Sequence, residues 1–320
     1  MYLAVDGGGS KLIGVVYDGQ LRPVCRARSG GVNPTQNSIE AIRAHIDEVA
    51  SQLAPCLGDV TDMDEVFVGA KDEFESAILR LRPEIRIRRL GEPEAGLLAG
   101  ACRRDGLLAL AGTGSDVFVI RSGRVVSAVG GWGPVMGDQG SGAWIGLQAL
   151  RSVCRAANGW GEQTMLKQLF EQRFGEPLDR RPPQEILKSK APYAVAAGLV
   201  PLVGQAAREG DGVALEILAR AGEAIAQQLE ALFKRVQCSD FFEVVLCGGA
   251  WKAHEQMLES CQKQLRRLDA RYTLKRPCFE HVLAGPALRL LESGMSESEA
   301  RLALSDRFPE YIVNKEAALA

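Results

Sequence analysis

The sequence carries almost no excess charge and few histidines. Its 320 residues include 38 Lys and Arg against 40 Asp and Glu, a formal net charge of −2. A nearly neutral chain lacks the electric field that attracts nucleic acids or anionic lipids, so we expect neither nucleic acid nor membrane as a partner. The three histidines, His45, His254 and His281, stand far apart, and no H-E-x-x-H motif occurs, which argues against a histidine-based metal site.

Long apolar runs and paired cysteines are also missing. No run reaches the roughly 18 residues of a membrane span, and the opening MYLAVDGG has no basic segment. We therefore expect no cleaved signal peptide and a cytoplasmic protein. The eight cysteines form no C-x-x-C pair, which favours buried thiols over a disulfide framework.

Glycine, in contrast, is abundant and clustered. There are 35 glycines among 320 residues, which exceeds the average usage of about 7%. The length predicts about two domains, and 46% hydrophobic with 24% charged residues is an ordinary globular balance.

An internal repeat divides the chain. In both copies an apolar strand runs into a glycine turn that ends in Ser, followed by a strand, a second turn and another strand. The turns at 7–10 and 112–115 are 105 positions apart. The repeat predicts two related domains, 1–111 and 112–320, with a C-terminal helix able to return to the first.

Helical patterns fill the intervals between strands. Apolar residues recur every three or four positions over 38–54 and 213–236. We expect Asn37 with Glu40 to cap the first helix and Asp211 the second. Strands are expected at 84–88 and before Gly248. An α/β fold follows from strands that alternate with long helices.

Three glycine turns, each after an apolar strand, are candidates for binding phosphate. Glycine lets backbone N–H groups converge on an anion. The chain contains neither a Walker A motif nor G-x-G-x-x-G, so P-loop NTPases and Rossmann dehydrogenases fit it poorly. The candidate residues of the three turns are Gly8, Gly9, Ser10 and Lys11; Gly112, Thr113 and Gly114; and Gly248, Gly249 and Ala250.

Asp6 ends the first strand, directly before the first glycine turn. A carboxylate there is suited to hold Mg²⁺ against phosphates gathered by the turn, although a strand-end Asp can instead cap the turn. Ser10 and Lys11 can donate to a phosphate oxygen, or Lys11 can be a solvated hairpin lysine. The arginines at 80, 82, 86, 88 and 89 are interpreted as a solvated strand face, with a nucleic-acid patch as the less favoured alternative.

The segment 130–146, GGWGPVMGDQGSGAWIG, is the densest glycine patch. Trp132 and Trp144 could supply an apolar wall for a sugar ring, and Asp138 could recognise hydroxyl groups. The alternative interpretation is a structural linker between the domains.

Taken in order, DGGGSK, SGGVNPTQ, AGTGS, GGWGPVMGDQGSGAWIG and CGGA resemble the BadF/BadG/BcrA/BcrD ATPase family, over residues 2 to about 290. Within it they most resemble the sugar kinases of the N-acetylglucosamine kinase type. The resemblance implies the actin-like ATPase fold of sugar kinases and heat-shock ATPases, in which two domains of similar topology flank a cleft. It also implies that the first two glycine turns are phosphate loops, that residues 247–250 contact adenosine, and that ATP with Mg²⁺ is the cofactor. The positions that match the sugar pocket or its surroundings are Asn33, Asp116, Gly131, Trp132 and Asp138.

The chain departs from the family at the catalytic base. The family usually places an Asp after the strand that precedes the second phosphate loop, whereas this chain has RLGEPEAGLLAGA. Alignment on the start of the helix puts Glu92 in that position, with Glu94 as a near alternative. Glu can accept a proton from a sugar hydroxyl as Asp does. Asp116 also stands where Asn is common.

The resemblance predicts an ATP-dependent and Mg²⁺-dependent kinase of a small amino sugar, acting at the C6 hydroxyl, and a possible homodimer. Two alternatives remain. One is an ATPase activator of an acyl-CoA dehydratase or reductase, which would need cysteines for an iron–sulfur cluster. The other is a catalytically weakened regulator that binds sugar without turnover.

Overall fold

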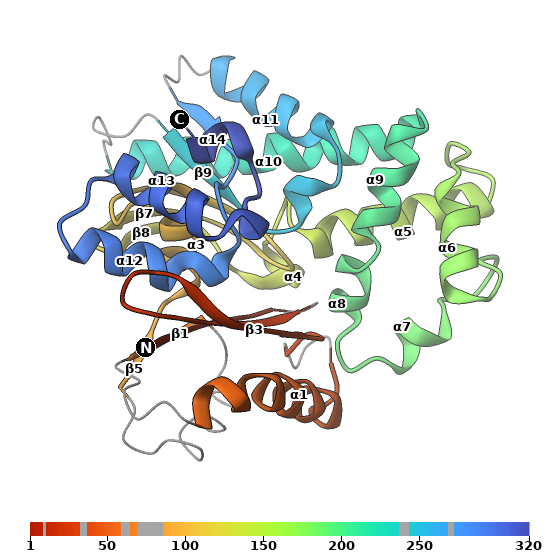
Figure 1. Ribbon diagram of the computed structural model, residues 1–320. Helices are drawn as coiled ribbons and strands as arrows, with labels where there is room; N and C mark the ends of the chain where they lie inside the picture. The colour runs from red at the N-terminus through yellow and green to blue at the C-terminus, as the bar shows by residue number, and fades with distance from the viewer. Residues whose placement is uncertain are drawn as a thin grey trace. The chain divides into compact units, whose positions relative to one another are not determined.

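The computed structural model describes residues 1–8, 11–32, 37–58, 65–69, 86–236, 243–267 and 272–319 (Figure 1). The chain forms two compact units, which are considered separately. Unit 1 comprises Met1–Asp105, Ile120–Arg124 and Arg276–Ala320, and unit 2 comprises Gly106–Val119 and Val125–Lys275. The boundary expected from the repeat, between residues 111 and 112, stays a prediction about domains.

A five-stranded mixed sheet of order β3-β2-β1-β4-β5 organises unit 1. The first three strands form the predicted antiparallel meander, and β4 and β5 add to it in parallel with β1. The bounds are β1 Tyr2–Gly7, β2 Leu12–Tyr17, β3 Pro23–Ser29, β4 Glu65–Gly69 and β5 Ile87–Arg89.

Both faces of this sheet are covered, and the period-two alternation of the strands assigns side chains to each face. Leu3 and Val5 enter one core with the helix α1 (Ile39–Gly58). Ala4 and Ile13 enter the other, which is built from the helices α3 and α12 to α14. The bounds of this second layer are α3 Glu92–Ala101, η2 His281–Leu283, α12 Ala284–Glu292, α13 Glu297–Arg307, η3 Pro309–Tyr311 and α14 Lys315–Leu319.

The start of α1 corrects one sequence prediction. Ser38, rather than Asn37, precedes the first helical residue, and its hydroxyl accepts the N–H of Ala41 at 3.2 Å. Both residue types are good N-caps, so sequence alone placed the cap one residue too early.

Arginines near β5 pair with acids of unit 1. The guanidinium of Arg88 donates to both oxygens of Glu292 at 2.8 and 2.6 Å, and Arg86 lies 3.3 Å from Glu65. Arg88 is therefore half-buried and paired, which differs from the interpretation of a fully solvated strand face; Arg80 and Arg82 lie outside the described residues.

Unit 2 repeats the sheet of unit 1. Its strand order is β10-β9-β6-β7-β8. When each strand number is lowered by five, this becomes β5-β4-β1-β2-β3, which is the order of the first sheet read from its other edge. The bounds are β6 Gly106–Ala111, β7 Ser115–Arg121, β8 Arg124–Gly130, β9 Glu243–Cys247 and β10 Thr273–Lys275. The duplication predicted from the glycine turns is therefore confirmed as two sheets of one topology.

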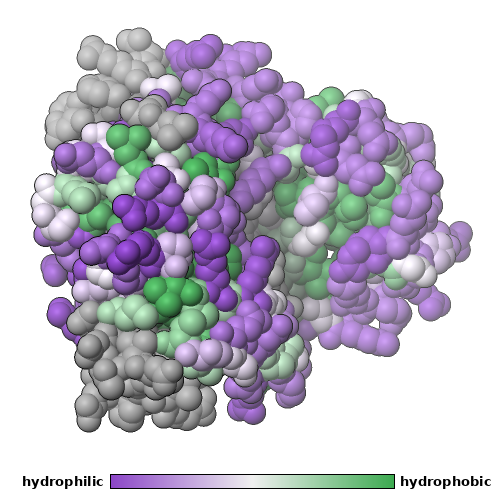
Figure 2. Space-filling model, in the orientation of Figure 1, coloured by the Kyte–Doolittle hydropathy of each residue, from purple (hydrophilic) through white to green (hydrophobic). Residues whose placement is uncertain are grey.

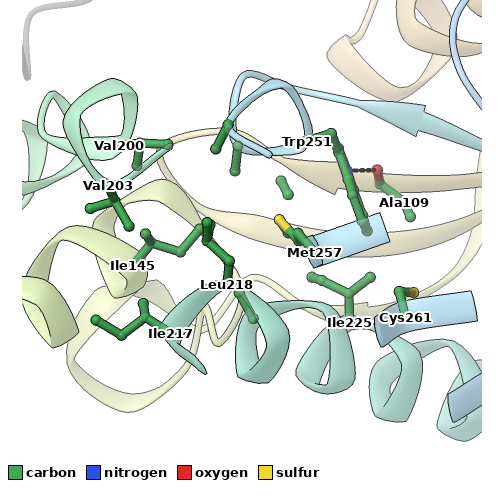
Figure 3. Close-up of a cluster of buried hydrophobic side chains, with 14 of the residues drawn as sticks. Ala109, Ile145, Val200, Val203, Ile217, Leu218, Ile225, Trp251, Met257 and Cys261 are labelled. Carbon is green, nitrogen blue, oxygen red and sulfur yellow. Dashed lines mark hydrogen bonds between the residues drawn. The ribbon is translucent and has the colours of Figure 1, made fainter. Parts of the chain in front are cut away.

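Helices pack on the sheet of unit 2 around its largest core (Figure 3). The indole N–H of Trp251 donates to the carbonyl of Ala109 at 3.1 Å, which satisfies its only polar atom inside this core. As predicted, Asp211 caps the long helix α10, accepting the N–H of Ala214 at 2.8 Å. The bounds are α4 Gly133–Met136, α5 Gly142–Ala157, α6 Leu166–Phe174, α7 Gln184–Lys188, α8 Pro192–Ala197, α9 Val200–Arg208, α10 Gly212–Val236, η1 Ala250–Lys252 and α11 Glu255–Arg267.

Hydrophilic side chains dominate the described atoms on the face seen in Figure 2, with hydrophobic ones in small groups between them. Among the described residues, no helix is both long enough and apolar enough to cross a membrane.

Candidate active site

Two acids predicted to be functional lie at one edge of the sheet of unit 1. The strands β1, β4 and β5 are parallel, so their carboxyl ends meet at the same edge. Asp6 is level with Gly69 at the end of β4. Glu92 follows the end of β5 by three residues and begins α3. Register and topology thus bring Asp6 and Glu92 to one edge, as expected of a metal ligand and a base.

The surroundings of Asp6 include charged residues from the far end of the sequence. Burial raises the pKa of this carboxyl, while the charges of His281 and Lys11 act in the opposite direction and Glu280 raises the pKa further. Nothing in the sequence indicated Glu280 or His281, because they reach Asp6 only through the packing of η2 against β1.

Lys11 forms an ion pair with Glu280 in unit 1. The adjoining turn is closed by the N–H of Gly8, which donates to the carbonyl of Lys11 at 2.9 Å. A Cβ on Gly8 would meet no atom within 4 Å, so the space beside this turn is open. Gly9, Ser10 and Asn33 lie outside the described residues, and their predicted roles stay predictions.

The structure distinguishes the two candidates for the base. Glu92 is exposed at the first position of α3, where no described residue bonds its carboxylate. Glu94 is half-buried and lies 3.7 Å from the guanidinium of Arg104. Burial raises the pKa of Glu94, and the charges of Arg104 and Arg88 oppose that rise. Glu94 therefore belongs to an internal charge cluster, whereas the carboxylate of Glu92 is exposed.

The second and third glycine turns lie side by side in unit 2. The strands β6 and β9 are parallel neighbours, with Leu110 level with Cys247, so both turns begin at the same edge of the sheet. Gly248 has a φ of +103°, and a Cβ there would lie 2.4 Å from the backbone of Ala111. Only glycine fits this close approach of two backbones.

The turn at 112–115 is held by the start of helix α5. The N–H of Gly142 donates to the carbonyl of Gly112 at 2.8 Å, and the N–H of Ala143 donates to that of Thr113 at 3.2 Å. A Cβ on Gly112 or on Gly249 would meet nothing within 4 Å, so both of these turns border open space. This combination of fixed backbone and open space suits a bound phosphate.

Asp138 is held in a strained position beside the second turn. It has a φ of +57°, which is uncommon for a residue other than glycine. The backbone N–H groups of Ser115 and Gly133 donate to its carboxylate, but burial outweighs them and raises its pKa. Strain of this kind clusters at functional sites. The arrangement supports a recognition role over a plain linker.

Three other predicted sugar residues lie in unit 2: Asp116 on β7, Gly131 directly after β8, and Trp132 directly before α4. Gly131 has a φ of +68°, and a Cβ there would lie 2.6 Å from the carboxylate of Asp116. Trp132 is 72% exposed and borders α4, in which Val135 and Met136 are also exposed. Trp144 differs from the expectation of an apolar wall, since it packs against the core of unit 2.

The residues present fit a nucleotide with Mg²⁺. Among the described residues, no group of three or more His, Cys, Asp and Glu could hold a metal by itself. Mg²⁺ usually retains waters and binds one or two carboxylates together with substrate phosphates. A single carboxylate such as Asp6 beside a glycine turn meets that need.

The sequence matches the family model described as the BadF/BadG/BcrA/BcrD ATPase family over residues 3–276. One curated relative, an N-acetylmuramic acid/N-acetylglucosamine kinase of Clostridium acetobutylicum, is 24% identical over 77% of this chain and 84% of its own length. Another, an N-acetyl-D-glucosamine kinase of Dictyostelium discoideum, is 26% identical over 78% of this chain and 85% of its own length.

Solved structures share the fold. A protein of Porphyromonas gingivalis, provisionally named an N-acetylglucosamine kinase, has a TM-score of 0.66 at 18% identity and covers 92% of this chain and 100% of its own. A ROK family glucokinase of Streptomyces griseus, solved with glucose and AMPPNP, has a TM-score of 0.53 at 16% identity and covers 89% and 96%. These similarities confirm the predicted fold class.

Proposed function

Because the chain belongs to the BadF/BadG/BcrA/BcrD ATPase family, we propose that it transfers the γ-phosphoryl group of ATP to a hydroxyl of an amino sugar. The substrate class is that of N-acetylglucosamine and glucosamine, and the acceptor is the C6 hydroxyl. The proposal rests on where the candidate groups lie in each unit. Asp6 and Glu92 lie at the carboxyl ends of parallel strands in unit 1, and two glycine turns, one of them beside Asp138, lie at the corresponding strand ends in unit 2.

In unit 2, the backbone of the turns at 112–114 and 248–250 binds the nucleotide. The N–H groups of a glycine turn stabilise phosphate charge without a side chain, and the open space beside Gly112 and Gly249 admits the ligand. In unit 1, Lys11 directly follows the first turn. It would exchange its partner Glu280 for a phosphate oxygen.

Asp6 would hold Mg²⁺, which supplies charge neutralisation for the phosphates when it is bound. Glu92 accepts the proton of the attacking hydroxyl, since its carboxylate is exposed at the start of α3. Asp138 accepts hydrogen bonds from sugar hydroxyls, and the exposed ring of Trp132 covers an apolar sugar face.

The test is a coupled assay of ADP release over a panel of hexoses, amino sugars and N-acetylated amino sugars, with and without Mg²⁺. We expect amino sugars to stimulate release most, and the product to carry phosphate at C6 by NMR. If no sugar stimulates ADP release but calorimetry detects sugar binding, the protein is instead a regulator without turnover. ATP hydrolysis in a brown, iron-containing preparation would favour the activator class.

A further inference from the structure

Two half-buried cysteines of unit 1 are in contact. Cys25 lies on β3 and Cys56 lies near the end of α1. The two thiols are neighbours, and burial together with the Cys56 thiol raises the pKa of Cys25 to about 11. The thiol of Cys25 also donates to the carbonyl of Gln52, one helical turn before Cys56, at 3.6 Å.

Polar contacts hold β3 and α1 in one register. The side-chain amide of Gln52 both accepts the N–H of Arg28 at 3.0 Å and donates to its carbonyl at 3.1 Å. The hydroxyl of Ser29 bonds Glu48 one turn earlier on the helix. The strand therefore runs antiparallel to α1, which places Cys25 and Cys56 at the end of this contact away from the connecting loop.

The other described cysteines differ from this pair. Four of them, Cys102, Cys247, Cys261 and Cys278, are buried, as the sequence predicted. Cys278 donates to the carbonyl of Ala317 at 3.3 Å. Cys154 is exposed on α5 of unit 2. Among the described residues, only Cys25 and Cys56 combine contact between two thiols with partial access to solvent.

We propose that Cys25 and Cys56 form a reversible disulfide when the protein meets a small-molecule disulfide oxidant, a modification independent of the proposed kinase activity. A thiolate of the pair attacks a sulfur of the oxidant, whose S–S bond breaks to release one thiol. The second thiolate then attacks the mixed disulfide, forms the Cys25–Cys56 bond and releases the second thiol. The two protein sulfurs lose two electrons and the oxidant gains them, while the two protons pass to its departing thiolates.

The bond would fasten the far end of α1 to β3. Cys25 and Cys56 enclose the connection between these elements, which carries Asn33, so the oxidised chain has fewer unfolded conformations. The expected result is a higher thermal midpoint of unit 1 without a change in fold.

The experiment uses the full chain, reduced and then equilibrated with glutathione buffers of increasing oxidised fraction. Free thiols are trapped by alkylation, and the disulfide is mapped by peptide mass spectrometry. We expect a peptide cross-linked through Cys25 and Cys56, formed in a single step as the buffer becomes more oxidising. The thermal midpoint should rise by about 5 °C or more on oxidation, as expected for a covalent cross-link in a unit of this size.

Three variants separate the pair from other thiols. Cys25→Ser and Cys56→Ser should each lose both the cross-link and the rise in midpoint, while Cys154→Ser should retain both. Circular dichroism of each reduced variant checks the fold. The proposal is wrong if the oxidised wild type carries separate glutathione adducts on Cys25 and Cys56, or if both remain open to alkylation at the most oxidising ratio.

Discussion

Gly114 and Asp138 are in such close contact that a Cβ on Gly114 would lie 2.9 Å from Oδ2 of the aspartate. The carboxylate of Asp138 is thereby packed against the second glycine turn, where the N–H of Ser115 also donates to it. The turn predicted to bind phosphate and the acid predicted to bind sugar are thus one packed structure within unit 2.

We expect Gly114→Ala to displace the carboxylate of Asp138, because the added methyl group cannot fit beside Oδ2. Overpacking of this kind costs about 1–3 kcal/mol of stability, and the sugar KM should rise together with the ATP KM. Gly112→Ala is the matched control, since its Cβ would meet open space. The control should keep stability while its ATP KM rises. Thermal melts measure the stability of both variants, and steady-state kinetics measure their KM values. An unaltered sugar KM in Gly114→Ala would contradict the prediction.

Asp6→Asn should abolish most turnover while keeping or raising stability. Burial raises the pKa of Asp6 in the folded state, so its ionised form is less favourable there than in the unfolded chain. The carboxylate therefore weakens the fold increasingly as the pH rises above its ordinary pKa, and the neutral amide removes that penalty.

The measurement compares thermal midpoints of wild type and Asp6→Asn from pH 4 to pH 8. The difference in favour of the amide should shrink toward the acidic end, as the pH approaches the ordinary pKa of Asp6 and this carboxyl begins to be protonated in the unfolded chain as well. A variant that melts lower than wild type at neutral pH, or that keeps full Mg²⁺-dependent activity, would contradict the assignment.

Glu92→Gln should lower kcat by about 10²–10⁴-fold, the usual contribution of a general base. Its exposed position predicts little change in thermal midpoint or in sugar binding. Glu94→Gln should instead nearly retain activity and keep or raise stability at neutral pH, because burial raises the pKa of Glu94 more than the charge of Arg104 lowers it. Kinetics and melts of both variants decide between the two acids; if Glu94→Gln is the inactive one, the base is Glu94.

Trp132→Ala should raise the sugar KM several-fold with little effect on stability, because the ring is 72% exposed and contributes little to the core. Trp160→Ala is the matched control, since that ring is 71% exposed elsewhere in unit 2. It should change neither the sugar KM nor the midpoint. Equal kinetic effects of the two substitutions would remove Trp132 from the sugar site.

The sequence predicted more of the two sheets than of the candidate site. Strand alternation and repeated glycine turns are local patterns, and they predicted both meanders. The helical periodicity of 213–236, also local, predicted the cap at Asp211. At the start of α1 the sequence offers two good capping residues, Asn37 and Ser38, and the local pattern does not decide between them. The left-handed backbone of Asp138, in contrast, was not predicted, and its carboxylate accepts from Ser115 of a distant strand as well as from nearby Gly133.

The other features that the sequence did not predict depend on contacts between separate elements. Glu280 bonds Lys11 from 269 residues away, and Arg104 lies beside Glu94. The pairing of Cys25 with Cys56 depends on the register of a strand on a helix. Such registers are set by packing, which the apolar pattern of either element alone does not specify.

The return of residues 276–320 to unit 1 has a consequence for the order of synthesis. One core of that unit contains Ala4, Ile13 and Leu98 together with Leu288 and Leu304, so its last members leave the ribosome only after all of unit 2. At a synthesis rate of about 5–20 residues per second, many seconds pass before residues 276–320 are available to cover the apolar face of β1 and β2. The part of the protein that is begun first is therefore completed last, and a nascent chain stalled before residue 276 exposes an unfinished sheet to chaperones and proteases.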